Sequence, residues 1–470
     1  MIWDFFIKQK LAYLHLVLEQ LLFLMYNNKQ LLNIGGILMK KYALPIGKRQ
    51  EEVSLPEEHV IYDIHGNQAT VCHDLPAAAL EAIRNPIGSK PLRELVHAGE
   101  SVAIIISDIT RLCGTSEFLP VIVAELNSVG VKDEDITVVV ATGTHRGHTH
   151  EEDITVCGEE MVKRLRIIQH DSRKKEDMVS LGKTSCGNDV AINKYVANAD
   201  RVILTGAVTL HPFAGFGGGR KAVMPGVAAY DSIMKNHCMT MSPIEGEGCN
   251  KACDASLLEG NPIHEDMKES CALLDPDFLL NTVFTPDGEI CEVVAGHWFD
   301  AWQKGCKDLL AMGGVHIKEL ADVVIASAGG YPKDLNLYQA TKCHMNAQFA
   351  VKKGGIMIFT LDCPDIKEPA IFTDCFSRND MEQFEKDIRA NFTIPAFVAF
   401  KARCIVNDVT AYLVTRKENF DFVRKTGHIP CETLQEAWDL AQAKLAEQGK
   451  KDYTITIMGH ASATLPILDK

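Results

Sequence analysis

Three short runs of apolar residues limit what the first half of this chain can fold into. They span residues 102–106, 136–140 and 202–204, and each is followed by small residues and then by a polar or ionisable one. Continuous apolar runs of this length are typical of strands that are buried on both faces of a parallel sheet. Segments with helical character, at residues 116–128 and 159–165, lie between the runs. The pattern predicts an α/β fold.

The second half of the chain repeats the pattern. Strands are expected at residues 323–326, 355–360, 404–406, 411–414 and 453–458, and a helix at residues 335–350. A chain of 470 residues is too long for one ordinary hydrophobic core. We therefore expect two α/β domains with mostly parallel sheets, an N-terminal domain over residues 39–312 and a smaller C-terminal domain over residues 313–470.

Further elements complete the expected fold. Short strands are expected at residues 60–64, 68–72, 166–170 and 191–194, and a strand pair at residues 278–284 and 289–295. Helices are expected at residues 76–84, 92–96, 228–238 and 296–312.

Residues 1–38 do not match the rest of the chain. The apolar stretch at residues 11–25 is interrupted by His15, Glu19 and Gln20, which is unusual for a transmembrane helix. No small-residue cleavage site of a signal peptide follows it. We expect a non-native or disordered N-terminal extension, with a peripheral amphipathic anchor as the alternative. The absence of another targeting segment predicts a cytoplasmic protein with no membrane partner.

Charge and cysteine content narrow the class of protein. The formal net charge is −14, from 48 basic and 62 acidic residues, which argues against nucleic acid as a partner. The 15 cysteines are scattered without a C-x-x-C pair, which fits free thiols in a reducing cytosol. Cys249 and Cys253 could ligate a metal, but no second pair stands nearby.

Ionisable residues follow the apolar runs of the first half. Asp108 and Arg111 come after the first run, His145 after the second and His211 after the third. In open α/β sheets, ligands bind where loops leave the carboxyl ends of parallel strands. We therefore expect these side chains to share one crevice, where two histidines could act as acid and base on opposite faces of one substrate carbon.

A Gly-rich loop (residues 215–226) follows His211 and contains Lys221, and the expected helix behind it carries His237. Glycines in such a loop would let backbone N–H groups approach a phosphate, which predicts a site for a phosphate-bearing ligand. The loop is not a Walker A motif, because Ala222 follows Lys221. It narrowly misses G-x-G-x-x-G at Arg220. A flexible, solvated loop is the alternative.

The helix expected at residues 335–350 carries Tyr338, Gln339 and Lys342 within one turn of each other. Together with Arg111 of the first domain, Lys342 could hold a carboxylate across the interdomain cleft.

Three further histidines are weaker candidates for a catalytic or metal-binding role. His170 is a rival for a catalytic role. His148 and His150 could suggest a metal, but the acidic residues that follow them favour a solvated loop.

Taken together, these residues resemble the motifs of the nickel-dependent lactate racemase family, the nickel-pincer 2-hydroxyacid racemases and epimerases. The resemblance runs from about Met39 to the C-terminus. It rests on Asp108-Ile109-Thr110-Arg111, Gly143-Thr144-His145, His211-Pro212 with the Gly-rich loop and Lys221, His237, and Tyr338-Gln339 with Lys342.

The resemblance implies an active site in the interdomain cleft and two cofactor components. These are nickel and a nickel-pincer nucleotide, pyridinium-3,5-bisthiocarboxylic acid mononucleotide, attached covalently through Lys221. His237 would be the metal ligand from the protein, and His145 and His211 the catalytic residues. The implied cofactor-binding residues are Asp108, Ile109, Thr110, Arg111, Lys221, His237 and Tyr338. The implied substrate-binding residues are Arg111, Gln339 and Lys342.

The activity implied is racemisation or epimerisation of a 2-hydroxy acid, by reversible hydride transfer to the cofactor through a 2-keto acid. The implied partners are the small-molecule substrate and the cofactor-biosynthesis enzymes: a carboxylase/hydrolase, a sulfur insertase and a nickel insertase. Lactate-specific members place a tryptophan beside the substrate, but this chain has none between Trp302 and Trp438. The substrate therefore stays open. The alternatives are a nicotinamide-type 2-hydroxyacid dehydrogenase and a non-catalytic nucleotide-binding protein.

Overall fold

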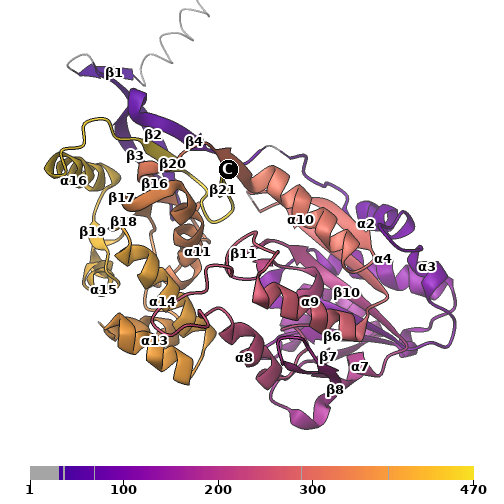
Figure 1. Ribbon diagram of the computed structural model, residues 1–470. Coiled ribbons are helices and arrows are strands. Elements are labelled where there is room, and N and C mark those ends of the chain that lie inside the picture. Colours follow the sequence, from indigo (N-terminus) through magenta and orange to yellow (C-terminus); the bar gives the residue numbers. More distant parts are fainter. Residues whose placement is uncertain (1–30, 35–36, 68, 287, 379, 470) are drawn as a thin grey trace, which may run out of the picture.

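Two six-stranded sheets form the framework of the computed structural model (Figure 1). The structure describes residues 31–34, 37–67, 69–286, 288–378 and 380–469. Most of the N-terminal extension expected at residues 1–38 therefore lies outside the described residues. Its last part contains β1 (Leu31–Ile34), which pairs antiparallel with β2 (Ile37–Ile46).

The first sheet has the strand order β14-β13-β10-β5-β6-β7. In chain order its strands are β5 (Val102–Ser107), β6 (Ile136–Ala141), β7 (Arg166–Gln169), β10 (Arg201–Val208), β13 (Phe278–Phe284) and β14 (Ile290–Gly296). All neighbours are parallel except β13 and β14. The three apolar runs form its centre, which confirms that they are buried strands of a mostly parallel sheet.

The second sheet has the order β19-β18-β17-β16-β20-β4 and is parallel throughout. Its strands are β4 (Val60–Ile64), β16 (Ala321–Ser327), β17 (Val351–Thr360), β18 (Thr410–Val414), β19 (Ile429–Cys431) and β20 (Ile455–Met458). Side chains of β2 and β3 (Arg49–Pro56) pack into the hydrophobic core of this sheet. Figure 1 shows these indigo strands beside the orange and yellow ones.

We expected residues 39–312 to form one N-terminal domain, and those domain bounds stay a prediction. The strand order nevertheless shows that residues 60–64 pair with β20 rather than with the first sheet. Below, the N-terminal half means the first sheet with its helices, and the C-terminal half means the second sheet with its helices.

Two expected strands are absent from the described residues of their segments. Residues 404–406 belong instead to helix α14 (Ile394–Asn407). Their β-branched side chains favour a strand locally, but the Thr393 cap and the apolar face of a 14-residue helix prevail. Residues 69–72 have no regular structure, so the strand expected at residues 68–72 is also wrong, with Gln68 lying outside the described residues.

Helices and short strands surround the sheets. In the N-terminal half they are α2 (Leu75–Arg84), α3 (Leu92–Leu95), α4 (Thr115–Ser128), α5 (His150–Cys157), α6 (Glu159–Arg164), β8 (Met178–Lys183), β9 (Asp189–Asn193), α7 (Lys194–Ala197), β11 (Leu210–His211), β12 (Gly215–Phe216), α8 (Tyr230–Cys238), α9 (Pro262–Leu274) and α10 (Asp300–Gly313). In the C-terminal half they are β15 (Gly314–Ile317), α11 (Leu337–Ala347), α12 (Ala370–Thr373), α13 (Met381–Ala390), α15 (Phe420–Lys425), α16 (Leu434–Glu447) and β21 (Leu465–Leu468).

Short 3-10 turns complete the described fold: η1 (Glu57–His59), η2 (Ile109–Arg111), η3 (Asp133–Asp135), η4 (Lys175–Asp177), η5 (Gly219–Ala222), η6 (Gln348–Ala350), η7 (Asp374–Ser377) and η8 (Lys417–Asn419). Among the residues that the structure describes, no helix is long and apolar enough to cross a membrane.

Candidate active site

A carboxylate–imidazole pair stands just past the ends of β5 and β6. Asp108 Oδ2 lies 2.6 Å from Nδ1 of His145. Burial by itself would raise the pKa of the Asp108 carboxyl, but hydrogen bonds from His145 and Thr110 and the charges of His145 and Arg111 outweigh it, so that pKa is lowered. A carboxylate accepts a hydrogen bond from Nδ1–H, so the neutral His145 ring presents a lone pair at Nε2. Nearly half of the His145 side chain (48%) is exposed, which leaves Nε2 open to a substrate.

The Gly-rich loop is packed into the protein, with Arg220 at its centre. The Arg220 side chain is fully buried and donates hydrogen bonds to the carbonyls of Ala214 and Phe216 and to Nδ1 of His264. Its guanidinium also lies 4.0 Å from the centre of a Trp302 ring. The loop is therefore ordered by these contacts, and the alternative of a flexible, solvated loop is wrong.

The amides of this loop are used inside the protein. Gly217 N–H donates to Thr209 O at 2.7 Å, and Gly219 N–H donates to Asn281 Oδ1 at 2.8 Å. A Cβ on Gly217 or Gly219 would come within about 2.6 Å of a neighbouring side chain. Close packing explains both glycines, and the two amides already have partners within the protein. The phosphate-binding role expected of the loop as a whole stays a prediction.

His211 ends β11 and is 8% exposed. Its Nδ1 accepts a hydrogen bond from Ala214 N–H at 3.2 Å, so the neutral ring carries its proton on Nε2. Burial, followed by the charges of Lys221, Arg111, His237 and Arg220, lowers the pKa of His211 well below its usual value. His211 is therefore neutral when the site is empty of anions.

Lys221 lies in η5 and is half-buried. Burial and the charges of Arg111 and Arg220 lower the pKa of its amine well below the usual value. In the described part of the chain, its ammonium group has no ion pair or hydrogen bond with another side chain. A lysine amine whose pKa is lowered is a better nucleophile than an ordinary lysine, because it loses its proton more readily.

His237 lies near the end of α8, and Phe213 stacks edge-on between it and His211. Its Nδ1 is 3.0 Å from Ile233 O, one turn earlier, so Nδ1 carries the proton and Nε2 keeps its lone pair. Burial first, and the charge of Lys221 second, lower the pKa of His237 to about 3. A neutral imidazole whose other nitrogen is held by a backbone carbonyl has the arrangement of a metal ligand.

Arg111 connects the two halves of the site. Its charge acts on the pKa of five residues: Asp108, His211, Lys221, Tyr338 and Lys342. The first three belong to the N-terminal half, and the last two lie on α11 of the C-terminal half. The Arg111 side chain is exposed and has no hydrogen bond or ion pair among the described residues. The structure therefore brings most of the residues expected at the site around one available cation.

The α11 residues face this cation from the second half. Lys342 Nζ lies 3.5 Å from Gln339 Oε1. The outer side of Lys342 is exposed to solvent. Burial of its amine against the protein, followed by the charges of Arg111 and Lys333, nevertheless lowers the pKa of Lys342 to about 8. Burial raises the pKa of the Tyr338 hydroxyl, against the opposing effect of Arg111. Gln339 is exposed.

Other residues from the sequence analysis make contacts within the protein. Thr110 donates to Asp108 Oδ1, and Ile109 N–H donates to Nε2 of His148. The His148 side chain is only 1% exposed and its Nδ1 contacts Asp153, so the expectation of a solvated loop is wrong there. His150 is exposed at the start of α5. Burial lowers the pKa of His170 to about 4, and both its ring nitrogens have protein partners.

Sequence reasoning missed two residues that shape the site. Arg220 entered only as the residue that breaks a glycine pattern. Lys401 is buried on α14, pairs with Asp254 at 3.0 Å and donates to the carbonyl of Pro212, the residue after His211. A lysine in a helical apolar segment, flanked by Phe400 and Ala402, was the available signal. Among the described residues, no group of three or more His, Cys, Asp or Glu side chains could hold a metal.

Two family models match the chain. The lactate racemase N-terminal domain matches residues 46–248, and the lactate racemase C-terminal domain matches residues 317–463. A lactate racemase of Thermoanaerobacterium thermosaccharolyticum is 31% identical over 420 residues, which cover 88% of this chain and 96% of the relative. A lactate racemase of Lactiplantibacillus plantarum is 35% identical over 326 residues, which cover 68% and 74%.

Solved structures agree with the sequence matches. The lactate racemase apoprotein from T. thermosaccharolyticum has a TM-score of 0.81 at 28% identity, over 91% of this chain and 100% of that chain. A protein from Thermotoga maritima has a TM-score of 0.57 at 14% identity, over 85% and 100%, which shows likeness of fold alone. With a relative above 30% identity along most of its length and both family domains matched, this chain belongs to the lactate racemase family and is an isomerase of the racemase type.

Proposed function

We propose that the chain racemises a small 2-hydroxy acid with the help of a nickel-pincer nucleotide. One observation carries the proposal. The exposed Arg111 guanidinium, which has no ion pair with any residue that the structure describes, lies within electrostatic range of the Asp108–His145 pair, His211, Lys221 and Lys342. Lactate is the first substrate to test, because the relatives are named lactate racemases. The absence of a tryptophan between Trp302 and Trp438 keeps other 2-hydroxy acids in view.

Substrate binding is assigned to the cations on the two sides of the site. Arg111 and Lys342 bind the carboxylate, one from each half of the protein, and Gln339 holds Lys342 in place. The charges of Arg111 and Lys342 repel each other, and this repulsion contributes to the lowered pKa of Lys342. Bringing in a carboxylate relieves the repulsion, which favours anionic substrates.

Proton transfer is assigned to His145 and His211. His145 accepts the substrate hydroxyl proton at Nε2, while Asp108 stabilises the resulting imidazolium through Nδ1–H. His211 serves the opposite face of the substrate. For His211 to take a proton at Nε2, its ring must place a hydrogen on Nδ1 and give up the bond from Ala214 N–H. The two histidines are therefore unequal in the free enzyme, and substrate binding must adjust the His211 segment.

The chain offers residues that fit the implied cofactor. The orphaned Nε2 lone pair of His237 suits nickel, and with no three-residue ligand group among the described residues, the other donors would come from the nucleotide. The lowered pKa of the Lys221 amine suits a covalent attachment. Asp108, Ile109, Thr110, Arg111 and Tyr338 are the further residues proposed to contact the nucleotide.

When bound, the nickel-pincer nucleotide supplies the group that takes up and returns the substrate α-hydride, with a 2-keto acid as the intermediate. The protein orients the carboxylate, moves the hydroxyl proton and limits access of water. The carboxylase/hydrolase, the sulfur insertase and the nickel insertase that make the cofactor are proposed as partners.

Mass spectrometry of intact protein tests the proposal. The chain is produced with and without the three cofactor-biosynthesis enzymes, and peptides are mapped. We expect a covalent adduct on Lys221 only when the enzymes are present. Lys221→Ala and Lys221→Arg should carry no adduct and have no activity, whereas Lys235→Ala, an exposed lysine on α8, should keep both.

An unmodified Lys221 together with net release of keto acid would favour the nicotinamide-type dehydrogenase instead. An unmodified Lys221 without turnover of any 2-hydroxy acid would reject the cofactor assignment.

A further inference from the structure

A loop of the N-terminal half is docked on two helices of the C-terminal half. We define this docking loop as residues 241–249. Gly246 N–H donates to Glu385 Oε1 on α13 at 2.9 Å. Arg389, also on α13, donates to the carbonyls of Ser242 and Ile244. The loop is therefore held by the other half of the molecule through directed hydrogen bonds.

The docking loop also leads directly to the candidate active site. It follows α8, whose last turn carries His237, and Asn250 ties its end back to that helix through Thr240 O and Met239 O. On the opposite side, α14 carries the buried Lys401, which holds the carbonyl next to His211. A covalent bond between this loop and α14 would therefore act on α8, which carries His237. It would also act on the segment beside His211, which Lys401 of α14 holds.

Two free thiols meet at this contact. Cys249 ends the docking loop, and Cys404 lies one turn after Lys401 on α14. Cys249 is the largest single influence on the pKa of the Cys404 thiol, so the two thiols lie near each other. The position of a Cβ on the neighbouring Gly248 would lie 4.0 Å from Cys404 Sγ, which places the loop backbone against this sulfur. A disulfide would require the two sulfurs to close to about 2 Å.

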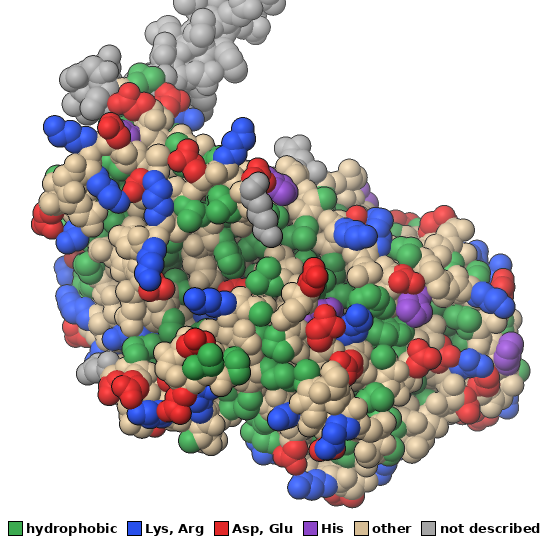
Figure 2. All heavy atoms as spheres, in the orientation of Figure 1, with side chains coloured by type: hydrophobic (Ala, Val, Ile, Leu, Met, Phe, Trp, Pro, Cys, Tyr) green, Lys and Arg blue, Asp and Glu red, His purple; other side chains and the backbone are tan. Residues whose placement is uncertain are grey.

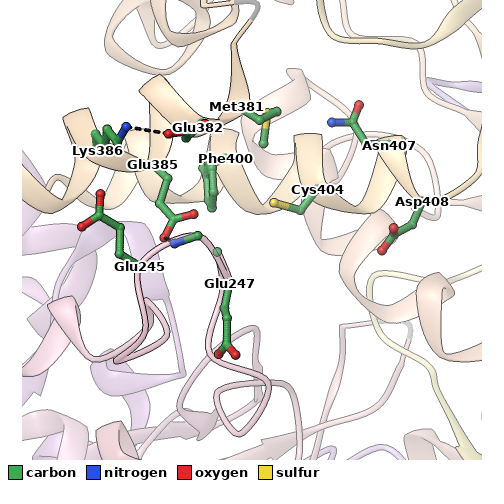
Figure 3. A pocket seen from close by; sticks show the side chains of 12 residues that line it. Glu245, Glu247, Met381, Glu382, Glu385, Lys386, Phe400, Cys404, Asn407 and Asp408 are labelled. Carbon is green, nitrogen blue, oxygen red and sulfur yellow. Dashed lines mark hydrogen bonds and ion pairs between the residues drawn. The ribbon is translucent and has the colours of Figure 1, made fainter.

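An open pocket reaches Cys404 and Gly248, the residue next to Cys249. It has a volume of about 730 Å³, and Cys404 is among its lining residues (Figure 3). Its acidic lining residues are Glu245, Glu247, Glu382, Glu385 and Asp408, against the single basic residue Lys386. Figure 2 shows acidic and basic side chains mixed over the α13 region of the surface. The acidic lining disfavours anionic oxidants such as glutathione disulfide and admits a neutral peroxide.

We propose that Cys249 and Cys404 form a peroxide-driven disulfide that clamps the N-terminal half to the C-terminal half. The Cys249 thiolate attacks one oxygen of hydrogen peroxide, the O–O bond breaks, and hydroxide leaves as water after it takes a proton. Cys404 sulfur then attacks the Cys249 sulfenic acid and gives its proton to the departing hydroxide, which leaves as a second water. Two thiols are oxidised and one peroxide is reduced to two waters. The pairing goes beyond the proposed function and does not depend on it.

Burial and neighbouring charge fit these unequal roles. The hydrogen bond with Cys249, followed by burial and the carboxylates of Asp408 and Glu385, raises the pKa of the Cys404 thiol. Cys404 therefore keeps its proton, which suits the second step, where that proton goes to the departing hydroxide.

Peptide mapping of the full chain after peroxide treatment tests the pairing. We expect a mass lower by two hydrogen atoms, two fewer thiols open to alkylation, and one cross-linked peptide pair that contains Cys249 and Cys404. Dithiothreitol should reverse all three changes. Cys249→Ser and Cys404→Ser should abolish the cross-link, whereas Cys186→Ser, a half-buried cysteine outside this contact, should keep it.

The clamp itself is measured by urea unfolding without reductant. The oxidised protein should unfold at a higher urea concentration than the reduced protein, because the disulfide closes a long loop between the two halves. An unchanged thiol count, oxidation that stops at sulfinic acid, or a cross-link only between other cysteines such as Cys72 and Cys291 would overturn the pairing. An unchanged urea midpoint in cross-linked protein would overturn the clamp.

Discussion

Asp108 Oδ2 lies 2.6 Å from Nδ1 of His145, at the ends of two neighbouring parallel strands. The carboxylate fixes the ring tautomer and favours the imidazolium form that arises when Nε2 takes a proton. The same carboxylate also accepts bonds from Thr110 through its other oxygen. Both oxygens of the Asp108 carboxylate are therefore engaged, which fixes its orientation. Asp108 thus positions the His145 ring as well as stabilising its charge.

Replacing the Asp108 carboxylate should slow proton transfer while substrate binding is largely kept. We expect Asp108→Asn to lower kcat in both directions by up to about 10,000-fold, because an asparagine amide can favour the wrong tautomer of a histidine that transfers protons. KM should change much less. Asp469→Asn is the matched control, because Asp469 lies 2.7 Å from Nδ1 of His316 on the surface, away from the site. Equal losses in both variants would remove Asp108 from the proton-transfer machinery.

His145→Ala and His211→Ala should each abolish racemisation in both directions. Each enantiomer needs one histidine as base and the other as acid, and losing such a group costs on the order of 100- to 10,000-fold. Rates are measured from each pure enantiomer, with His316→Ala as the control for a surface histidine. Full turnover in either site variant would make that histidine structural.

The lowered pKa of Lys342 makes substrate binding depend on pH. With a pKa of about 8, Lys342 is cationic below pH 8 and loses its charge as the pH rises through that value. Because the cation is assigned to the substrate carboxylate, KM should rise above pH 8 while the protein stays folded. Lys342→Arg should flatten the profile, since a guanidinium stays charged there. A KM independent of pH up to pH 9.5 in the parent protein would exclude this role.

Packing of the Gly-rich loop can be tested separately from chemistry. Gly219 has φ +53°, and a Cβ there would lie 2.5 Å from Trp302. Gly187 has φ +73° with nothing within 4 Å of its Cβ position, so it shares the backbone strain without the clash. Thermal unfolding should show Gly219→Ala to be less stable than Gly187→Ala by about 1–3 kcal/mol. Equal destabilisation would mean that Trp302 moves aside freely.

Local sequence patterns predicted the strands of both sheets well where burial is uniform. Residues 102–106, 136–140 and 202–204 are apolar because both faces of each strand are covered, so composition alone identified them. The family resemblance was confirmed by the comparisons, and with it the two-domain α/β fold. The pairing of β4 with β20 could not be predicted, because it joins residues nearly 400 positions apart.

The environment of single side chains was harder to predict than the strands. His148 precedes several acidic residues, a pattern typical of a solvated loop. In the structure one of those carboxylates, that of Asp153, contacts the buried His148 ring at Nδ1. Arg220 is buried against backbone carbonyls, His264 and Trp302, which are distant in sequence or carry no sequence signal. The glycines near it were assigned to a ligand, although tertiary packing against Asn281 and Trp302 requires them.

The hydride step can be followed with an α-deuterated substrate. A racemase that removes a proton would exchange this hydrogen with solvent, whereas a hydride taken up by a cofactor and returned to the keto acid stays with the substrate. Racemisation of α-deuterated lactate in ordinary water by the loaded enzyme should therefore give product that keeps its deuterium, and turnover should slow if hydride transfer limits the rate. The control is the same reaction in deuterium oxide with unlabelled substrate, which should gain no α-deuterium. Loss of the label at the rate of racemisation would leave His145 and His211 as a two-base proton-abstraction pair, with no hydride step between them.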